Sequence, residues 1–79
     1  MEIKILGTGC AKCNALFKAV NETVQEMGVS ADVVKVETMD EIVEAGVLIT
    51  PGLMINGKLK VMGKVPGKGD LKRYILQEI

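Results

Sequence analysis

Histidine and tryptophan are missing from this 79-residue sequence, which holds only two cysteines, Cys10 and Cys13. Two cysteines are too few for the disulfide framework of a small secreted domain, and in a reducing compartment such a pair is usually catalytic or metal-binding. No apolar run approaches the ~18 residues of a membrane span. Met1 leads directly into strand-like sequence, so we expect no signal peptide. We therefore expect a cytoplasmic protein that does not interact with membranes.

Aromatic residues are almost as scarce, with one phenylalanine and one tyrosine. The net charge is zero, but residues 51–79 carry six lysines and arginines against two acids, whereas residues 1–50 carry four lysines against eight acids. Single-stranded nucleic acids are bound where aromatic side chains interleave with basic ones. Because they do not interleave here, we expect no nucleic-acid binding, and the basic residues should cover solvated faces of a strand and a helix.

Aliphatic residues, by contrast, are abundant. Apolar residues make up 48% of the chain, which is enough for one compact core, and a chain of this length has no room for a second domain. The sequence shows no internal repeat, linker or low-complexity segment. We expect a single domain over residues 1–79 that works as a monomer.

The first half of the chain predicts a strand, a long helix and a second strand. Residues 2–6 alternate isoleucine with charged residues, as a half-buried strand does. The apolar positions of residues 13–27 recur at the spacing of an amphipathic helix, which should end at Gly28. Residues 32–37 contain a run of valines typical of a strand. A strand–helix–strand unit of this kind is right-handed, so the two strands should be parallel.

A short helix should follow the second strand. Residues 38–41 fit a capping box, with Thr38 as the N-cap and Glu41 at N3. This helix should end at Gly46, and residues 47–50 should then be extended.

The last part of the chain predicts a hairpin and a final helix. Asn56-Gly57 is a strong turn signal between strands at 52–55 and 58–62. After a loop rich in glycine and lysine, a helix should run from Asp70 onward. The residues expected to face the core are Leu71, Tyr74, Ile75 and Ile79. The order of elements is then βαβαββα.

Cys10 and Cys13 lie where the first strand gives way to the long helix. Helical residues three apart have Cβ atoms ~5–6 Å from each other, so the pair can form a disulfide. The unpaired N–H groups and the dipole of a helix N-terminus stabilise a thiolate, so the pKa of Cys10 should fall below the ordinary ~8.5. Burial should disfavour the thiolate of Cys13. A pair of inert structural cysteines is the alternative interpretation.

Three neighbours of the pair bear on its reactivity. Lys12 either adds positive charge beside the Cys10 thiolate or is simply solvated. Gly7 and Gly9 carry no side chain that would obstruct a docking polypeptide, and they allow the tight turn out of the strand.

Pro51 precedes the third strand. Proline cannot donate a ladder hydrogen bond, so it interrupts pairing at the entrance of the strand. The backbone groups of Thr50 can then pair with an extended segment of a substrate. A plain turn proline is the alternative.

Several short segments along the chain together carry a family likeness: Gly7-Thr8-Gly9-Cys10-Ala11-Lys12-Cys13, Gly46-Val47, Thr50-Pro51, Ile55-Asn56-Gly57-Lys58, Gly63 and Pro66. On these residues the chain resembles a minimal thioredoxin-fold protein, and especially the small glutaredoxin-like redox-active disulfide proteins of archaea and bacteria. The resemblance implies an α/β, thioredoxin-like fold: a four-stranded mixed sheet with helices on both faces. It also implies a cis Thr50–Pro51 peptide bond facing the cysteines, with Gly63 lining the same groove. Larger thioredoxins carry Trp before the first cysteine and Gly-Pro between the two, whereas this chain has Gly9 and Ala11-Lys12 at those positions.

The leading function is that of a thiol–disulfide oxidoreductase, an enzyme and electron carrier. The Cys10 thiolate attacks a protein disulfide, a mixed disulfide forms, and Cys13 attacks it to release the reduced product. A thioredoxin-reductase-like enzyme or another thiol reductant must then restore the dithiol. The cysteine pair is the only redox group that this chemistry needs, so we expect no other cofactor and no metal.

A soft-metal carrier for Cu(I), Zn(II) or Hg(II) is the second function class, because metal-trafficking domains also place a CxxC at their first strand-to-helix junction. Those domains have βαββαβ order and usually a methionine where this chain has Thr8. Only two soft ligands converge here, whereas structural zinc takes four. A non-catalytic interaction domain is the third class, and the joint presence of both cysteines and Pro51 argues against it.

Overall fold

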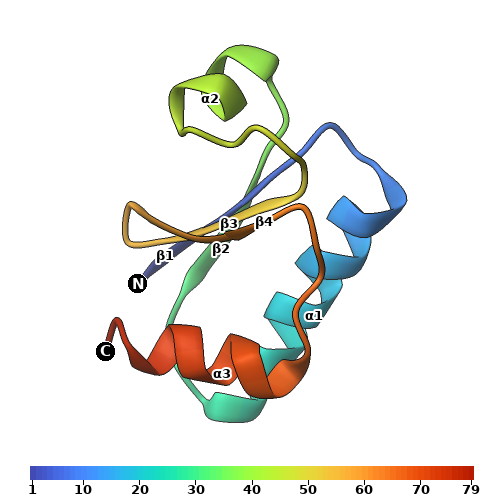
Figure 1. Cartoon of the computed structure of the whole chain (residues 1–79). Coiled ribbons are helices and arrows are strands. Elements are labelled where there is room, and N and C mark those ends of the chain that lie inside the picture. Colours follow the sequence, from blue (N-terminus) through green and yellow to red (C-terminus); the bar gives the residue numbers. More distant parts are fainter.

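The computed structural model of the chain describes all residues from 1 to 79. Seven elements follow one another in the predicted order (Figure 1). Their bounds are β1 Glu2–Leu6, α1 Ala11–Met27, β2 Asp32–Val36, α2 Met39–Glu44, β3 Gly52–Ile55, β4 Lys58–Met62 and α3 Lys68–Leu76. None of the three helices combines the length with the apolar character that crossing a membrane requires.

The four strands form one mixed sheet in the order β2-β1-β3-β4. β1 and β2 pair in parallel, as expected for strands joined by α1, with Ile3 opposite Val33. β3 runs antiparallel to both β1 and β4. β1 is therefore a central strand, and the chain leaves its C-terminal end directly into the turn that carries the cysteines.

Helices cover both faces of this sheet. In Figure 1, α1 and α3 lie together below the sheet and α2 lies above it. α1 and α3 also contact each other. The predicted fold class, a four-stranded mixed sheet with helices on both faces, is confirmed.

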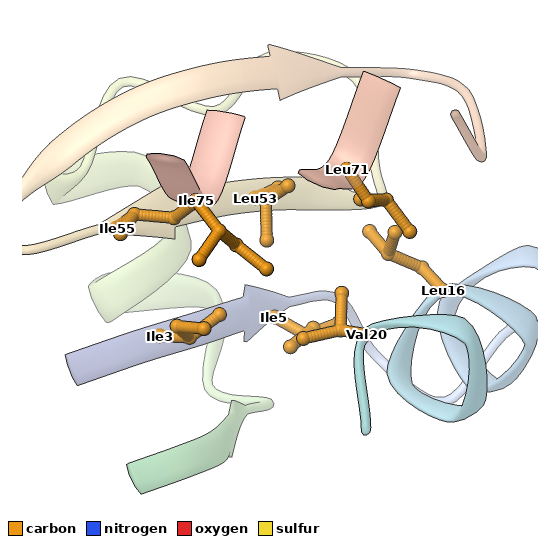
Figure 2. Close-up of a cluster of buried hydrophobic side chains, with 8 residues drawn as sticks. All are labelled: Ile3, Ile5, Leu16, Val20, Leu53, Ile55, Leu71 and Ile75. Atoms are coloured by element: carbon orange, nitrogen blue, oxygen red, sulfur yellow. The ribbon is translucent and has the colours of Figure 1, made fainter. Parts of the chain in front are cut away.

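The larger of two apolar cores lies between the sheet and the α1–α3 layer. Figure 2 shows its buried side chains: Ile3, Ile5, Leu16, Val20, Leu53, Ile55, Leu71 and Ile75. Full burial of one such side chain stabilises the fold by about 1.5–3 kcal/mol relative to exposure. Leu16 comes one turn after Cys13, so this core anchors the helix that carries the cysteines. A smaller core on the α2 side consists of Leu6, Val36, Ile42 and Val47.

The chain reverses direction where glycines predict it. Gly28 closes α1 with φ +67°, and its N–H donates to the Gln25 carbonyl at 3.2 Å. This left-handed C-cap is the conformation that glycine adopts without steric cost. Asn56 and Gly57 have φ values of +51° and +80°, as a two-residue hairpin turn requires.

The prediction of a capping box at the start of α2 is wrong. Thr38 is the N-cap and its carbonyl accepts the N–H of Ile42 at 3.1 Å, but its side chain makes no capping hydrogen bond. Thr38 and Glu41 are both exposed, so water can satisfy the first N–H groups of this helix. The prediction that residues 47–50 are extended is wrong as well. The N–H of Val47 bonds back to Ile42 at 3.2 Å, and residues 48–50 form a bend.

The final helix begins earlier than expected. α3 starts at Lys68 rather than Asp70, because the Gly67 carbonyl already accepts the N–H of Leu71 at 3.0 Å. The expected inward face is present except at Ile79, which is 75% exposed because it lies beyond the end of the helix.

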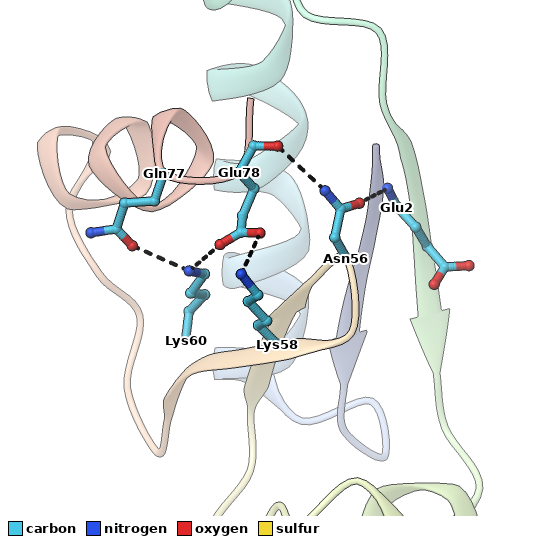
Figure 3. A network of polar contacts seen from close by, with 6 residues as sticks. All are labelled: Glu2, Asn56, Lys58, Lys60, Gln77 and Glu78. Carbon is cyan, nitrogen blue, oxygen red and sulfur yellow. Dashed lines mark hydrogen bonds and ion pairs between the residues drawn. The ribbon is translucent and has the colours of Figure 1, made fainter.

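Polar contacts tie the C-terminal end of the chain to the β3–β4 hairpin (Figure 3). The Glu78 carboxylate accepts a hydrogen bond from Lys60 at 2.7 Å and pairs with Lys58 at 3.3 Å. These contacts, the Lys60 bond first among them, hold the pKa of Glu78 below its ordinary value. The side chain of Asn56 accepts the N–H of Glu2 at 2.9 Å. Lys60 is therefore largely covered by its partners, which corrects the expectation that the basic residues are all simply solvated.

Candidate active site

The cysteine pair lies at the junction of β1 and α1. Just after β1, the N–H of Gly7 donates to the Val36 carbonyl at 2.9 Å, which extends the pairing with β2 by one residue. Gly9 then has φ +83°, a left-handed conformation that residues with a side chain rarely adopt. After this turn, Cys10 lies at the N-cap position of α1.

Cys10 and Cys13 form a disulfide with their Cα atoms 5.0 Å apart. Cys13 is only 4% exposed, whereas Cys10 is partly exposed. The Cys10 sulfur accepts the backbone N–H of Cys13 at 3.1 Å, so it takes the capping role that a Ser or Asp oxygen usually plays. One sulfur thus lies at the helix N-terminus near the surface, and the other lies in the interior.

Gly7 is buried rather than open to a docking polypeptide, which corrects the expectation for this residue. A Cβ atom built on Gly7 would overlap the sulfur of Cys13 and would lie 3.8 Å from the Cβ of Thr50. Gly7, Cys13 and Thr50 come from three separate segments, and they meet at this point. Thr50 therefore lies beside the cysteine pair, as the resemblance implies.

Thr50, Pro51 and Gly63 lie together beside this contact. Pro51 is buried, and the Thr50–Pro51 peptide bond is cis. The Pro51 carbonyl accepts the N–H of Gly63 at 2.8 Å. A Cβ on Gly63, whose φ is +82°, would lie 3.0 Å from Cγ2 of Ile49. The residues that the resemblance assigns to one groove are thus neighbours in space.

Exposed apolar side chains surround these residues. Leu48 and Ile49, directly before Thr50, are 83% and 62% exposed, and Met62 and Val65, on either side of Gly63, are exposed as well. Such a group beside a reactive site is typical of a surface that contacts other proteins. Sequence reasoning missed these four residues. The sequence did contain one sign of exposure here: two large aliphatic residues in succession precede Thr-Pro, and they fit neither the spacing of a helix nor the alternation of a strand.

Two charged side chains lie close to the turn. Lys12 is exposed in the first turn of α1. An oxygen of Glu37 lies 3.8 Å from the position that a Cβ on Gly9 would take. Sequence reasoning did not single out Glu37, because this residue reaches the turn only through the pairing of β2 with β1.

A cavity of about 260 Å³ lies on the opposite face of the sheet, under α2. Its lining residues are Lys4, Leu6, Val36, Glu41, Glu44, Ala45 and Met54. Neither cysteine is among them, so the disulfide lies outside this cavity. No group of three or more His, Cys, Asp or Glu side chains is arranged to hold a metal ion.

Comparison with known sequences agrees with this geometry. A family model described as a thioredoxin domain matches residues 1–76, a range that includes both cysteines and the Thr50, Pro51 and Gly63 positions. A thioredoxin from Methanothermobacter thermautotrophicus is 45% identical over 75 residues, which cover 95% of this chain and 97% of that protein. A thioredoxin from Methanocaldococcus jannaschii is 40% identical over 77 residues, covering 92% of this chain and 88% of that protein.

Proposed function

Since the chain belongs to the thioredoxin family and is a thiol–disulfide oxidoreductase, we propose that it carries electrons from a thiol reductant to protein disulfides. The asymmetry of the cysteine pair is the observation that supports this proposal. Cys10 is partly exposed and its sulfur accepts an N–H at the helix N-terminus, whereas Cys13 is buried behind it.

The roles of the two cysteines follow from this asymmetry. In the reduced protein the Cys10 thiolate attacks one sulfur of a substrate disulfide, and the other substrate sulfur leaves with the bonding electron pair and takes a proton from water. The Cys13 thiolate then attacks the Cys10 sulfur and displaces the second substrate thiol. Two electrons have passed to the substrate, and the Cys10–Cys13 disulfide has formed. A thioredoxin-reductase-like enzyme or another thiol reductant returns two electrons to the pair.

The substrate surface in this proposal consists of Thr50, Pro51 and Gly63 with the exposed side chains of Leu48 and Ile49. Pro51 has no N–H to donate to a neighbouring strand, so the chain around Thr50 can accept an extended segment of the substrate. The apolar side chains before Thr50 offer a contact area that a small disulfide cannot use. The proposal therefore favours protein disulfides over small ones.

Further parts of the proposal follow from the same chemistry. Lys12 and Gly9 act as modulators, Lys12 by its charge beside the thiolate and Gly9 by leaving the approach to Cys10 open. The disulfide is the only redox group, without a metal or another cofactor. The protein works as a monomer of a single domain in the cytoplasm, where thiols are kept reduced.

Alkylation and two serine variants test the assigned roles. In reduced protein near neutral pH, iodoacetamide should label Cys10 well before Cys13, as mass spectrometry of the peptides would show. Cys10→Ser should abolish disulfide reduction. Cys13→Ser should attack a protein disulfide once and remain attached to it through Cys10.

Cys10→Ser is the matched control for that trapping experiment, because it keeps one thiol but should capture nothing. Labelling of Cys13 first, or normal turnover by Cys13→Ser without a trapped adduct, would show that the roles are assigned wrongly.

A further inference from the structure

Gly7 occupies a position where the backbone itself does not call for glycine. Glycine is required where φ lies in the left-handed region, as at Gly9 and Gly63, but Gly7 is not among the residues with positive φ. Its φ therefore does not exclude a residue with a side chain. The constraint comes instead from space, because a Cβ on Gly7 would overlap the Cys13 sulfur and would lie 3.1 Å from the Cys13 Cβ.

The backbones of Gly7 and Cys13 are both held in place. The N–H of Gly7 is fixed by its hydrogen bond to Val36 at 2.9 Å. Cys13 belongs to α1, which the buried side chains of Leu16 and Val20 hold against the sheet. Real Cβ atoms do not come this close to a neighbouring atom, so an added methyl group would have to displace the sulfur.

We propose that Gly7 is a positioning residue for the redox reaction, and that its missing side chain provides the space in which the Cys13 sulfur rests in the disulfide. The inference builds on the oxidoreductase chemistry of the pair. It assigns to Gly7 an influence on how readily the disulfide forms, in addition to its place in the fold.

The oxidised protein depends on this space more than the reduced protein does. In the disulfide, the Cys13 sulfur is bonded to Cys10, which is itself held as the N-cap of α1. In the dithiol, the Cys13 side chain is released and can adopt another staggered rotamer. A methyl group at position 7 should therefore raise the free energy of the disulfide more than that of the dithiol.

The redox equilibrium of Gly7→Ala tests the inference directly. In a glutathione buffer, the protein disulfide and two reduced glutathione molecules exchange with the protein dithiol and one oxidised glutathione, a transfer of two electrons. Overpacking by a methyl group typically changes an equilibrium by about 5- to 150-fold. Because the dithiol retains part of the crowding, we expect a shift of about tenfold toward the dithiol, which is about 30 mV for a two-electron couple.

Two control variants separate this effect from a general loss of stability. Gly69→Ala adds a methyl group that meets no atom within 4 Å, and Ile75→Val weakens the core without touching either sulfur. Both should keep the redox equilibrium within about twofold of the wild type. If Gly7→Ala folds in both redox forms and also stays within twofold, the inference is wrong.

A double-variant comparison covers the case in which Gly7→Ala fails to fold when oxidised. Cys13→Ala removes the sulfur that the new methyl group would overlap. Gly7→Ala should then be tolerated much better in the Cys13→Ala protein than in the wild type, as measured by urea unfolding. Equal damage in both proteins would show that the sulfur is not what requires glycine here, and would overturn the inference.

Discussion

Reduction of the Cys10–Cys13 disulfide should weaken the fold by a small and calculable amount. The two residues are three apart in the sequence, so the disulfide closes a loop of only four residues. In the chain-entropy model, closing so short a loop stabilises a protein by about 2 kcal/mol. For a domain of this size, that corresponds to a fall in Tm of about 8–16 °C on reduction.

The helix N-terminus should offset part of this loss. A thiolate there is stabilised by about 0.3–1 kcal/mol, and in the reduced protein the pKa of Cys10 should lie below the ordinary ~8.5. A group whose pKa is lowered by folding adds stability that is fully present above its unfolded pKa and is lost as the pH falls through its folded pKa. The difference in stability between the oxidised and reduced proteins should therefore be largest in mild acid, and it should narrow as the pH rises toward ~8.5.

Urea unfolding followed by far-UV circular dichroism measures both effects, since the chain has no tryptophan for fluorescence. The Cys10→Ser/Cys13→Ser double variant is the control, because its stability should not respond to a reductant. The two apolar cores contain neither cysteine, so the reduced protein should stay folded. Unfolding on reduction at 25 °C, or a difference in stability that widens with rising pH, would refute the reasoning.

Five further outcomes are expected. Leu71→Ala should lower the free energy of unfolding by about 2–5 kcal/mol in urea, because Leu71 is fully buried, whereas Leu76→Ala on the exposed side of the same helix should change it by less than about 0.5 kcal/mol. Glu78→Gln should make the free energy of unfolding fall less as the pH is lowered. The pKa of Glu78 is lowered in the folded protein, so the wild type loses the stabilisation by this carboxylate as the pH falls below ~4.3. Glu26→Gln should change the free energy of unfolding little, because the Glu26–Lys68 ion pair is half exposed. Pro51→Ala should slow the reduction of a protein disulfide more than that of a small disulfide; equal slowing of both would contradict the proposed groove. Protein purified in air should contain no stoichiometric zinc or copper by elemental analysis, and tight one-to-one metal binding without disulfide reduction would favour the metal-carrier alternative.

The elements of the fold could be predicted because each depends mainly on local chemistry. The alternation in β1, the helical spacing in α1 and the turn at Asn56-Gly57 are properties of adjacent residues, and the structure confirms each of them. The parallel pairing of β1 and β2 followed from the one long helix between them. Local chemistry was a weaker guide at Thr38, because an exposed side chain can leave a helix N-terminus to water instead of capping it.

The cysteine pair could also be found from the sequence, but most of its surroundings could not. Leu48 and Ile49 are as apolar as the core residues, but they lie exposed in the bend after Val47. Glu37 approaches the turn because β2 pairs with β1, which brings its end beside Gly9. These positions depend on contacts between segments that are distant in the sequence, and no local pattern encodes them.

The two glycines before Cys10 show why such contacts decide function. Sequence reasoning gave Gly7 and Gly9 the same role, but their requirements are different. Gly9 has φ +83° and only a glutamate oxygen near its missing side chain, so it is needed for its backbone torsion. Gly7 is not among the glycines with positive φ, and the Cys13 sulfur overlaps the position that its Cβ would take, so it is needed for space. A glycine in a sequence does not reveal which requirement applies. The structure distinguishes the two, and only the requirement at Gly7 involves a sulfur of the disulfide.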